Sequence, residues 1–200
     1  KAPMFSFTRL RGADPKLGVE MSSTGEVACF GVNAHDAFLK SLLSTGFKLP
    51  SKTMNILLSI ANEDFRKEFL EAAKILQKLG YNLYGTPGTA QFYESRGLKI
   101  VSVEKPSDED DDQRAGALKM IKDGEIDMTI NIPEGTDRKD EITAGYILRR
   151  ASVDFGSSLV TNIKCAVMLS EALELDAAEK KHVLNHIADF HKRPMMGFSK

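Results

Sequence analysis

From Met54 onward, short apolar runs alternate with stretches of helical spacing, and this alternation narrows the choice of architecture. Residues 55–60 form an apolar run, as expected of a buried strand. In the stretch that follows, apolar side chains recur every three or four residues, which is typical of a helix with one buried face. Asn62 is placed to cap this helix, and Gly80 to end it. Short strands that alternate with helices predict an α/β fold, with a parallel sheet covered by helices on both faces.

The same spacing predicts the other strands and helices of this domain. Further strands are expected at 81–84, 98–103, 126–132 and 159–162. Further helices are expected at 89–96, 113–122, 141–154 and 164–173, and the acidic run 108–112 is expected to be a solvated loop. Ligands of such sheets bind in the crevice beyond the carboxyl ends of the strands, so polar residues that follow a strand are candidates for a site.

The first fifty residues have a different character. They contain five glycines and few periodic stretches, apart from a helical pattern at 34–43. We expect this part to be the tail of another fold, ending at a linker at 48–52. The expected organisation is therefore a tail at 1–50, an α/β domain at 51–175 and a terminal linker helix at 176–200.

The composition argues against several classes of partner. With 27 Lys and Arg against 28 Asp and Glu, the formal net charge of −1 gives no overall attraction to nucleic acid or to an anionic membrane. An anion must therefore be bound by a local site. Cys29 and Cys165 are too few for a disulfide framework and favour a reducing compartment. No apolar run reaches the length of a membrane span.

One loop has the residues of a phosphate site. Positions 86–89 read Thr-Pro-Gly-Thr, follow an expected strand and open an expected helix. A tight turn with hydroxyls, free backbone N–H groups and a helix N-terminus can bind phosphate. An ordinary turn with a threonine cap has the same spacing, and both interpretations stay open. Lys105 comes just past one further strand and Asn131 lies at the end of another, so they are expected at the same edge of the sheet.

Two other patterns suggest different kinds of site. Arg149 and Arg150 precede Ser152 as in a site for a basic-directed kinase. Alternatively, these arginines lie near a helix end and pair with acidic neighbours. His182 and His186 could lie on one side of a helix, but no third metal ligand is evident, so no metal is expected. No P-loop, GxGxxG or GxSxG motif is present, which favours a binding domain over an enzyme.

Several segments resemble the large subunit of carbamoyl-phosphate synthetases. Those similar to the end of its second ATP-grasp half are residues 7–15, 17–27, 38–40 and 43–48. Those similar to its methylglyoxal-synthase-like allosteric domain are residues 85–90, 127–131 and 147–151. The resemblance keeps this order over about residues 3–175 and does not include the tail that follows.

The resemblance implies a methylglyoxal-synthase-like domain with a five-stranded parallel sheet, preceded by the tail of an ATP-grasp domain. It also implies a pocket for a phosphorylated effector. The residues that the resemblance and the phosphate loop assign to this pocket are Thr86, Gly88, Thr89, Lys105, Asn131 and Ser59, with Arg66 or Lys67 as an additional cation. Pro133 stands where bacterial relatives have threonine, so their ribose or base contacts there do not carry over.

The resemblance further implies a role within a larger enzyme. The whole synthetase makes carbamoyl phosphate from bicarbonate, an ammonia source and ATP, with Mg or Mn. Its partners would be the rest of the large subunit and a glutaminase. The catalytic carboxylates and the ATP site are expected upstream of Lys1, so we expect this chain to be non-catalytic and to need no cofactor of its own.

Two branches of this family and one lyase remain as alternatives. Pyrimidine-pathway synthetases respond to uridine nucleotides and phosphoribosyl diphosphate, and Lys105 matches this cytoplasmic branch. Urea-cycle synthetases respond to N-acetylglutamate, are mitochondrial and carry tryptophan in place of Lys105, although residues 28–31 resemble them. A methylglyoxal synthase needs a carboxylate base beside the phosphate loop, and Tyr84 and Gly85 cannot serve. We expect a pyrimidine-type effector domain.

Overall fold

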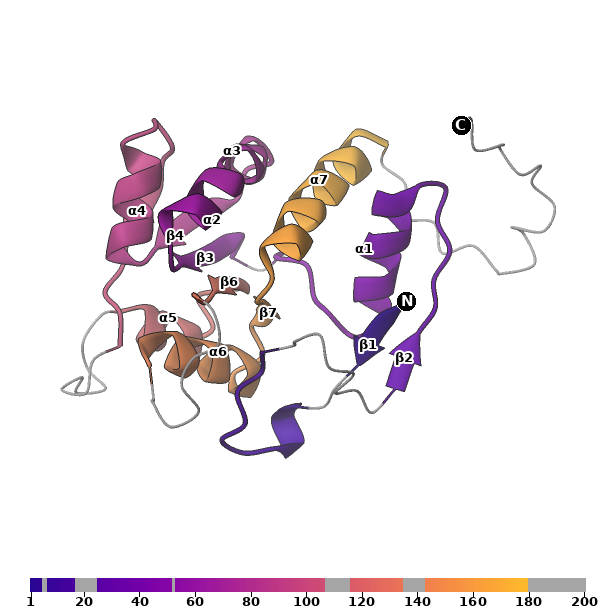
Figure 1. The fold of residues 1–200 in the computed structure, drawn as a ribbon, viewed down its shortest axis with the longest axis horizontal. Coiled ribbons are helices and arrows are strands. Elements are labelled where there is room, and N and C mark those ends of the chain that lie inside the picture. Colours follow the sequence, from indigo (N-terminus) through magenta and orange to yellow (C-terminus); the bar gives the residue numbers. More distant parts are fainter. Residues whose placement is uncertain (5–6, 17–24, 52, 107–115, 135–142, 180–200) are drawn as a thin grey trace.

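The computed structural model describes residues 1–4, 7–16, 25–51, 53–106, 116–134 and 143–179 (Figure 1). Its strands are β1 (Ala2–Met4), β2 (Gly25–Val27), β3 (Asn55–Ile60), β4 (Asn82–Gly85), β5 (Ile100–Ser102), β6 (Met128–Ile132) and β7 (Ser158–Val160). Its α-helices are α1 (Ala34–Ser44), α2 (Glu63–Glu68), α3 (Leu70–Lys78), α4 (Pro87–Glu94), α5 (Ala117–Lys122), α6 (Ala144–Asp154) and α7 (Ile163–Glu179), and a 3-10 helix, η1, covers Phe7–Arg9.

Five strands form one parallel sheet in the order β5-β4-β3-β6-β7. Strand β3 lies at the centre, where Leu57 is in register with Tyr84 of β4 on one side and with Thr129 of β6 on the other. The chain therefore builds outward from β3 to β5 and then returns to add β6 on the opposite side. This reversal places a topological switch point between β3 and β6, where ligands of such sheets bind.

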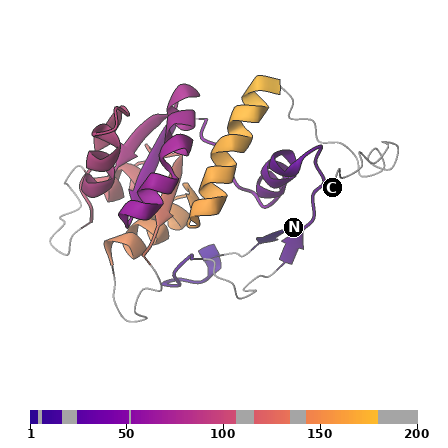
Figure 2. The same cartoon turned by 45° about the horizontal axis from the view of Figure 1, so that its top comes forward.

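Helices cover both faces of the sheet, as the alternating sequence predicts (Figures 1 and 2). On one face, Ile56, Leu58 and Ile60 of β3 join the main core with residues of α3, α4 and α7. On the other face, Leu57 packs with residues of α5 and α6. Burial of β3 on both faces explains why this strand is a continuous apolar run rather than an alternating one. The predicted fold class is confirmed.

Several boundaries differ from those that the spacing predicts. The helix expected after Asn62 is divided between α2 and α3 at Phe69, which is fully buried and has a ψ of −1°, far from the helical value of about −42°. Helix α5 begins at Ala117, and the expected helical residues 113–115 and the acidic run 108–112 lie outside the described residues. Helix α7 continues to Glu179, across the boundary expected at residue 175.

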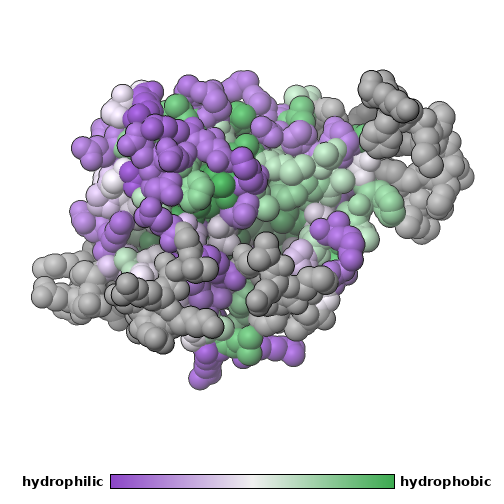
Figure 3. Space-filling view, in the orientation of Figure 1, coloured by the Kyte–Doolittle hydropathy of each residue, from purple (hydrophilic) through white to green (hydrophobic). Residues whose placement is uncertain are grey.

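The N-terminal region packs on the α/β body. The predicted helix near residue 34 is present as α1, whose Leu39 is 3% exposed and belongs to the main core with residues of α7. Across these two helices, His35 Nε2 lies 3.0 Å from Glu171 Oε2. Figure 3 shows mainly polar surface over α2, α3 and α4, and a more apolar surface over α7 and α1. Strands β1 and β2, which no pattern predicts, form a separate antiparallel pair.

The described residues include no helix that is both long and apolar enough to cross a membrane.

Candidate functional site: an anion pocket at the sheet edge

A pocket of about 210 Å³ lies at the carboxyl ends of β3 and β6, at the switch point of the sheet. Its wall combines polar groups that follow these strands with residues from the first turns of helices. The lining residues used below are Ser59, Arg66, Thr86, Lys105, Asn131, Glu134, Thr143, Ala144, Gly145 and Arg149. Five of the predicted site residues, from separate parts of the sequence, are thus brought together here.

Helix α4 begins at this pocket. Gly85 allows the close approach of the helix, because a Cβ at this position would lie 3.0 Å from the backbone nitrogen of Ala90. Thr86 is the N-terminal cap residue, and its carbonyl accepts hydrogen bonds from the N–H groups of Thr89 and Ala90, each at 2.8 Å. No described residue accepts a hydrogen bond from the Gly88 N–H, which leaves one donor available at the positive end of the helix dipole.

The two threonines of the predicted phosphate loop have different roles. Thr86 lines the pocket, whereas Thr89 is 1% exposed and is not part of the wall. The Thr89 hydroxyl accepts from the Ile60 N–H at 3.1 Å and from the Thr86 hydroxyl at 3.3 Å, and it donates to the Ile60 carbonyl at 3.3 Å. A hydroxyl has one donor and two acceptor sites, so this one is fully used in joining α4 to β3. The structure thus shows the Thr89 hydroxyl bonded within the protein, and its contact with a ligand stays a prediction.

Arg66 supplies a cation to the pocket. Its Nε donates to the Ile60 carbonyl at 2.9 Å, and its Nη2 donates to the Ala61 carbonyl at 2.8 Å. These bonds hold the guanidinium at the end of β3 and beside Gly88, where an added Cβ would lie 3.5 Å from Nη2. Among the described residues, Arg66 has no carboxylate partner, so none of their carboxylates neutralises its positive charge.

The two lysines predicted as site residues lie in different places, one on the pocket wall and one outside it. Lys105 lines the pocket, is exposed and has no carboxylate partner among the described residues. Lys67 lies outside the pocket wall, where its ammonium pairs with Glu63 at 3.0 Å and with Asp64 at 3.8 Å. The hydrogen bond between Lys67 and Glu63 raises the pKa of Lys67 and lowers that of Glu63. Of the pair Arg66 and Lys67, it is Arg66 that faces the site.

Ser59 and Asn131 lie in the pocket as the resemblance implies. Asn131 is 2% exposed, and its Oδ1 accepts a hydrogen bond from Nη1 of Arg149 at 3.0 Å. Arg149 is itself 1% exposed, and its Nε and Nη2 donate to the two carboxylate oxygens of Asp14, each at 2.7 Å. A second arginine therefore borders the pocket, but its charge is paired with a carboxylate from the N-terminal region.

The first turn of α6 is a part of the site that the sequence reasoning missed. Thr143 caps this helix, with its Oγ1 accepting from the Tyr146 N–H at 3.2 Å. Ala144 and Gly145 line the pocket, and a Cβ at Gly145 would lie 3.2 Å from Arg149 Nη1. A Thr-Ala-Gly run that follows a strand is the signal that could have identified this helix start. Glu134 also lines the pocket and is exposed.

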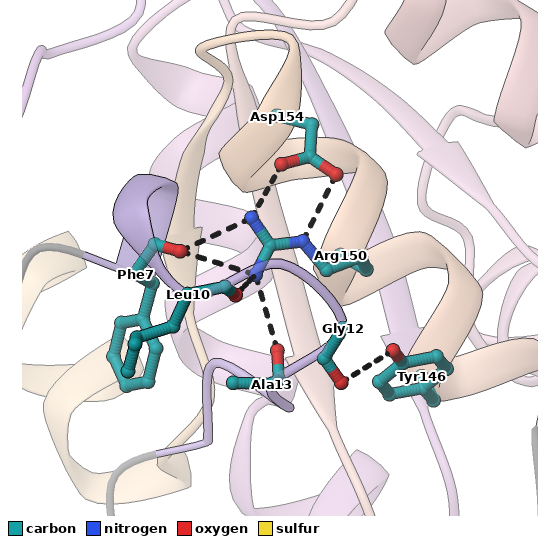
Figure 4. Close-up of polar contacts among 7 residues, drawn as sticks. All are labelled: Phe7, Leu10, Gly12, Ala13, Tyr146, Arg150 and Asp154. Atoms are coloured by element: carbon teal, nitrogen blue, oxygen red, sulfur yellow. Dashed lines mark hydrogen bonds and ion pairs between the residues drawn. The ribbon is translucent and has the colours of Figure 1, made fainter.

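Arg150 and Ser152 belong to the same run as Arg149. Their contacts argue against recognition by a kinase. The Arg150 guanidinium pairs with Asp154 and donates to the carbonyls of Leu10 and Ala13, each at 3.1 Å, and of Phe7 (Figure 4). The bond with Asp154 raises the pKa of Arg150 and lowers that of Asp154. This arrangement confirms that Arg150 pairs with an acidic neighbour, and it shows that Arg150 also binds the N-terminal segment.

Ser152 is fully buried, and its hydroxyl donates to the Leu148 carbonyl at 2.8 Å and to the Thr129 hydroxyl at 2.9 Å. A kinase needs an exposed, extended substrate segment, whereas this serine lies inside a helix. The structure therefore contradicts the interpretation of Ser152 as a phosphorylation site of the folded domain. His182 and His186 lie outside the described residues, among which no group of three potential metal ligands occurs.

The combined geometry is that of an anion receptor. Two helices begin at the pocket, and each helix start carries a partial positive charge and unpaired N–H groups. Arg66 and Lys105 add two full positive charges, and Ser59 adds a hydroxyl group. Such a set can hold a phosphate group from several sides through charge-assisted hydrogen bonds.

Comparisons with known proteins agree with this architecture. Residues 68–161 match the MGS-like domain family. The multifunctional protein URA2 of Saccharomyces cerevisiae is 44% identical over 195 residues, which are 93% of this chain and 9% of that protein. The multifunctional protein CAD of Squalus acanthias is 44% identical over 88% of this chain and 8% of its own length. The mitochondrial carbamoyl-phosphate synthase [ammonia] of Aquarana catesbeiana is 44% identical over 91% of this chain and 12% of its own length. The chain thus spans about a tenth of the length of these relatives.

Proposed function

Since residues 68–161 of this chain belong to the MGS-like domain family, we propose that the chain is the effector-binding regulatory region of a carbamoyl-phosphate synthase. The observation that carries this proposal is the pocket at the switch point, where Arg66 and Lys105 have no carboxylate partner among the described residues. Two helix starts face the same space. A binding site with this charge and no evident nucleophile suits a ligand that is recognised rather than transformed.

The proposed effector is a phosphorylated nucleotide or phosphoribosyl compound, such as UMP, UTP or phosphoribosyl diphosphate. Its phosphate would lie against Thr86 and the start of α4, between Arg66 and Lys105. Ser59 and Asn131 would contact the remainder of the ligand. Because much of this binding would be electrostatic, the affinity should fall as the salt concentration rises.

N-acetylglutamate is the alternative effector, and identity to relatives does not separate the two branches. The proteins named above are 44% identical to this chain whether they are multifunctional proteins or the mitochondrial synthase. Lys105 favours a phosphate ligand, because it adds a positive charge at the rim. The acetyl and methylene groups of N-acetylglutamate would gain from an aromatic wall, and the chain contains no tryptophan. We therefore place the parent enzyme in pyrimidine biosynthesis in the cytoplasm.

The parent enzyme would supply everything that catalysis requires. We propose that ATP, with Mg or Mn, binds to other parts of the synthetase, and that a glutaminase delivers ammonia. Residues 1–50 would then be the end of an ATP-grasp half. On this view the 200-residue chain forms no carbamoyl phosphate from ATP, bicarbonate and ammonia, and a coupled ADP-release assay that detects turnover would contradict the assignment.

Isothermal titration calorimetry of the chain with UMP, UTP, phosphoribosyl diphosphate and N-acetylglutamate tests the proposal. We expect at least one phosphorylated ligand to bind and N-acetylglutamate to bind weakly or not at all. Lys105→Met should weaken phosphate binding about tenfold through loss of one charge-assisted contact. Lys67→Met is the matched control and should leave the affinity unchanged, because Lys67 lies outside the pocket. Tight binding of N-acetylglutamate alone would overturn the choice of effector.

A methylglyoxal synthase activity is the second candidate function, and Glu134 is the observation that favours it. The residues before Thr86 offer no carboxylate, but Glu134 places one on the pocket wall. It is exposed, however, and a base of this kind benefits from burial, which raises the pKa of a carboxylate toward neutrality. We expect no methylglyoxal from dihydroxyacetone phosphate. Formation of methylglyoxal that Glu134→Gln abolishes would make the chain a lyase.

A further inference from the structure

Arg149 is the only described residue that joins the pocket wall directly to the N-terminal segment by charge. Its Nη1 donates to Asn131 Oδ1, and its Nε and Nη2 donate to the carboxylate of Asp14. Asn131 and Arg149 both line the pocket, whereas Asp14 does not. One guanidinium thus contacts a pocket residue on one side and a carboxylate 135 positions away in the sequence on the other.

The position of this guanidinium is tightly set. The Arg149 side chain is 1% exposed, so it is shielded from water while residues 7–16 are docked. Gly145 at the start of α6 leaves just enough room for it, since a Cβ there would lie 3.2 Å from Nη1. The pairing with Asp14 is bidentate, the geometry in which an arginine binds a carboxylate most strongly.

The segment that carries Asp14 is attached to α6 by a second arginine and by a tyrosine. Arg150 donates to the carbonyls of Phe7, Leu10 and Ala13, and the Tyr146 hydroxyl donates to the Gly12 carbonyl at 2.8 Å (Figure 4). These contacts are to neutral backbone groups and lie outside the pocket. Of the contacts between described residues of this segment and α6, the one with Asp14 brings a negative charge next to the pocket.

We infer that Arg149 is a positioning residue of the anion pocket and that Asp14 sets its effective charge. When residues 7–16 are docked, the Asp14 carboxylate neutralises Arg149 and weakens the binding of an anion in the pocket. An anion that binds beside Arg149 shares the same guanidinium and repels the carboxylate, so it loosens the docking of this segment. By linkage, the two effects are the same coupling free energy seen from either side.

This inference deepens the proposed function, because it gives the pocket a route to the N-terminal region. A ligand can alter a distant part of a protein only if it binds two states with different affinity. Here the two states are the docked and released forms of residues 7–16, and the difference between them is one negative charge next to the pocket. The sign follows from the charges alone: like charges oppose each other, and the segment and the anion compete.

The test measures inorganic phosphate and UMP binding to the full chain and to three variants by calorimetry. Asp14→Asn keeps the shape and one acceptor oxygen but removes the charge, and it should raise the affinity for both ligands about three- to tenfold. The gain is limited because the Asp14 side chain is 32% exposed and partly screened by salt. Asp14→Glu keeps the charge and should bind close to wild type. Asp154→Asn removes a carboxylate from the other arginine of the same attachment and should leave the affinity unchanged.

A reciprocal measurement keeps the inference testable if Asp14→Asn folds poorly. In the wild-type chain, saturating phosphate or UMP should speed hydrogen exchange at the amides of Leu10 and Ala13, which donate within the docked segment. Equal or weaker binding by Asp14→Asn, or slower exchange with ligand, would overturn the inference.

If phosphate binds with the predicted gain but UMP does not bind, the nucleotide proposal fails and the inference stands. If UMP binds wild type and Asp14→Asn equally, the proposed function stands and the inference fails, and if no anion binds any variant, both fail.

Discussion

Two arginines border the same pocket, and the protein treats their charges in opposite ways. Arg66 is held by two backbone carbonyls, those of Ile60 and Ala61, which fix its position without cancelling its charge. Arg149 is held by the carboxylate of Asp14 and by the side chain of Asn131. The contacts of Arg66 leave its positive charge available to a ligand. The charge of Arg149 is paired with Asp14, and this pair joins the pocket wall to the N-terminal segment. Anchoring by carbonyls thus leaves the charge of Arg66 available to a ligand, whereas anchoring by Asp14 makes the charge of Arg149 depend on the N-terminal segment.

Loss of the Arg149 guanidinium should produce the largest change in stability. Arg149→Met removes the partner of Asp14 and Asn131, and breaking a buried pair of this kind should lower the free energy of unfolding by about 2–4 kcal/mol, since Asp14 is only partly buried. Urea unfolding followed by circular dichroism measures this change. Arg66→Met should cost less than about 1.5 kcal/mol, because it loses only two hydrogen bonds to carbonyls near solvent. Equal losses in the two variants would erase the distinction between the arginines.

For ligand binding, Arg66 should matter most. Arg66→Met removes a charge-assisted contact worth about 1.5–3 kcal/mol, so the affinity for a phosphorylated ligand should fall roughly ten- to a hundredfold. Calorimetry with UMP or inorganic phosphate measures the loss. Arg96→Met is a suitable control, because Arg96 lies over the Phe92 ring and outside the pocket wall. An unchanged affinity in folded Arg66→Met would remove this arginine from the site.

The two helix starts offer a matched pair of glycines, one beside each arginine. Each is the second residue of its helix, but an added Cβ would lie 3.5 Å from Arg66 Nη2 at Gly88 and 3.2 Å from Arg149 Nη1 at Gly145. Gly88→Ala should be neutral or stabilising by up to about 1 kcal/mol, because alanine favours the helix. Gly145→Ala should lose that gain and be destabilised by about 1 kcal/mol, because the contact presses on a guanidinium that three hydrogen bonds hold in place. Thermal unfolding of the pair measures the difference, and a reversed order would show that Arg149 moves freely.

The sequence predicted the sheet well because its signal is local. The apolar run of β3 and the helical spacing after it specify a strand buried on both faces and a covering helix, and the parallel order follows. The same rule located the pocket at the strand ends, and it correctly placed Thr86, Lys105 and Asn131 there. Polar residues in short loops after strands can therefore be predicted as pocket residues from the sequence.

What could not be predicted depends on partners far apart in sequence. The spacing of Arg149 and Arg150 gives no sign that Asp14 and the carbonyls near Phe7 are their partners. Nor does a threonine reveal which way its hydroxyl turns, and Thr89 of α4 bonds to Ile60 of β3. The glycines of residues 1–50 interrupt the periodic spacing of apolar residues, so the sequence predicts a separate tail there. In the structure, however, α1 adds Leu39 to the main core.

The smallest effect concerns pH and the ion pair between Arg150 and Asp154. The hydrogen bond from Arg150 lowers the pKa of Asp154. The stabilisation from this pair is therefore fully present above the ordinary aspartate pKa of about 3.9 and is lost as the pH falls below that value, through the lower pKa of the folded state. Because the Asp154 side chain is 46% exposed, the contribution should stay below about 1 kcal/mol. Urea unfolding of wild type and Asp154→Asn at pH 6 and pH 3 should show a stability difference that shrinks at the lower pH. A difference that is the same at both values would mean that Asp154 acts through shape and not through its charge.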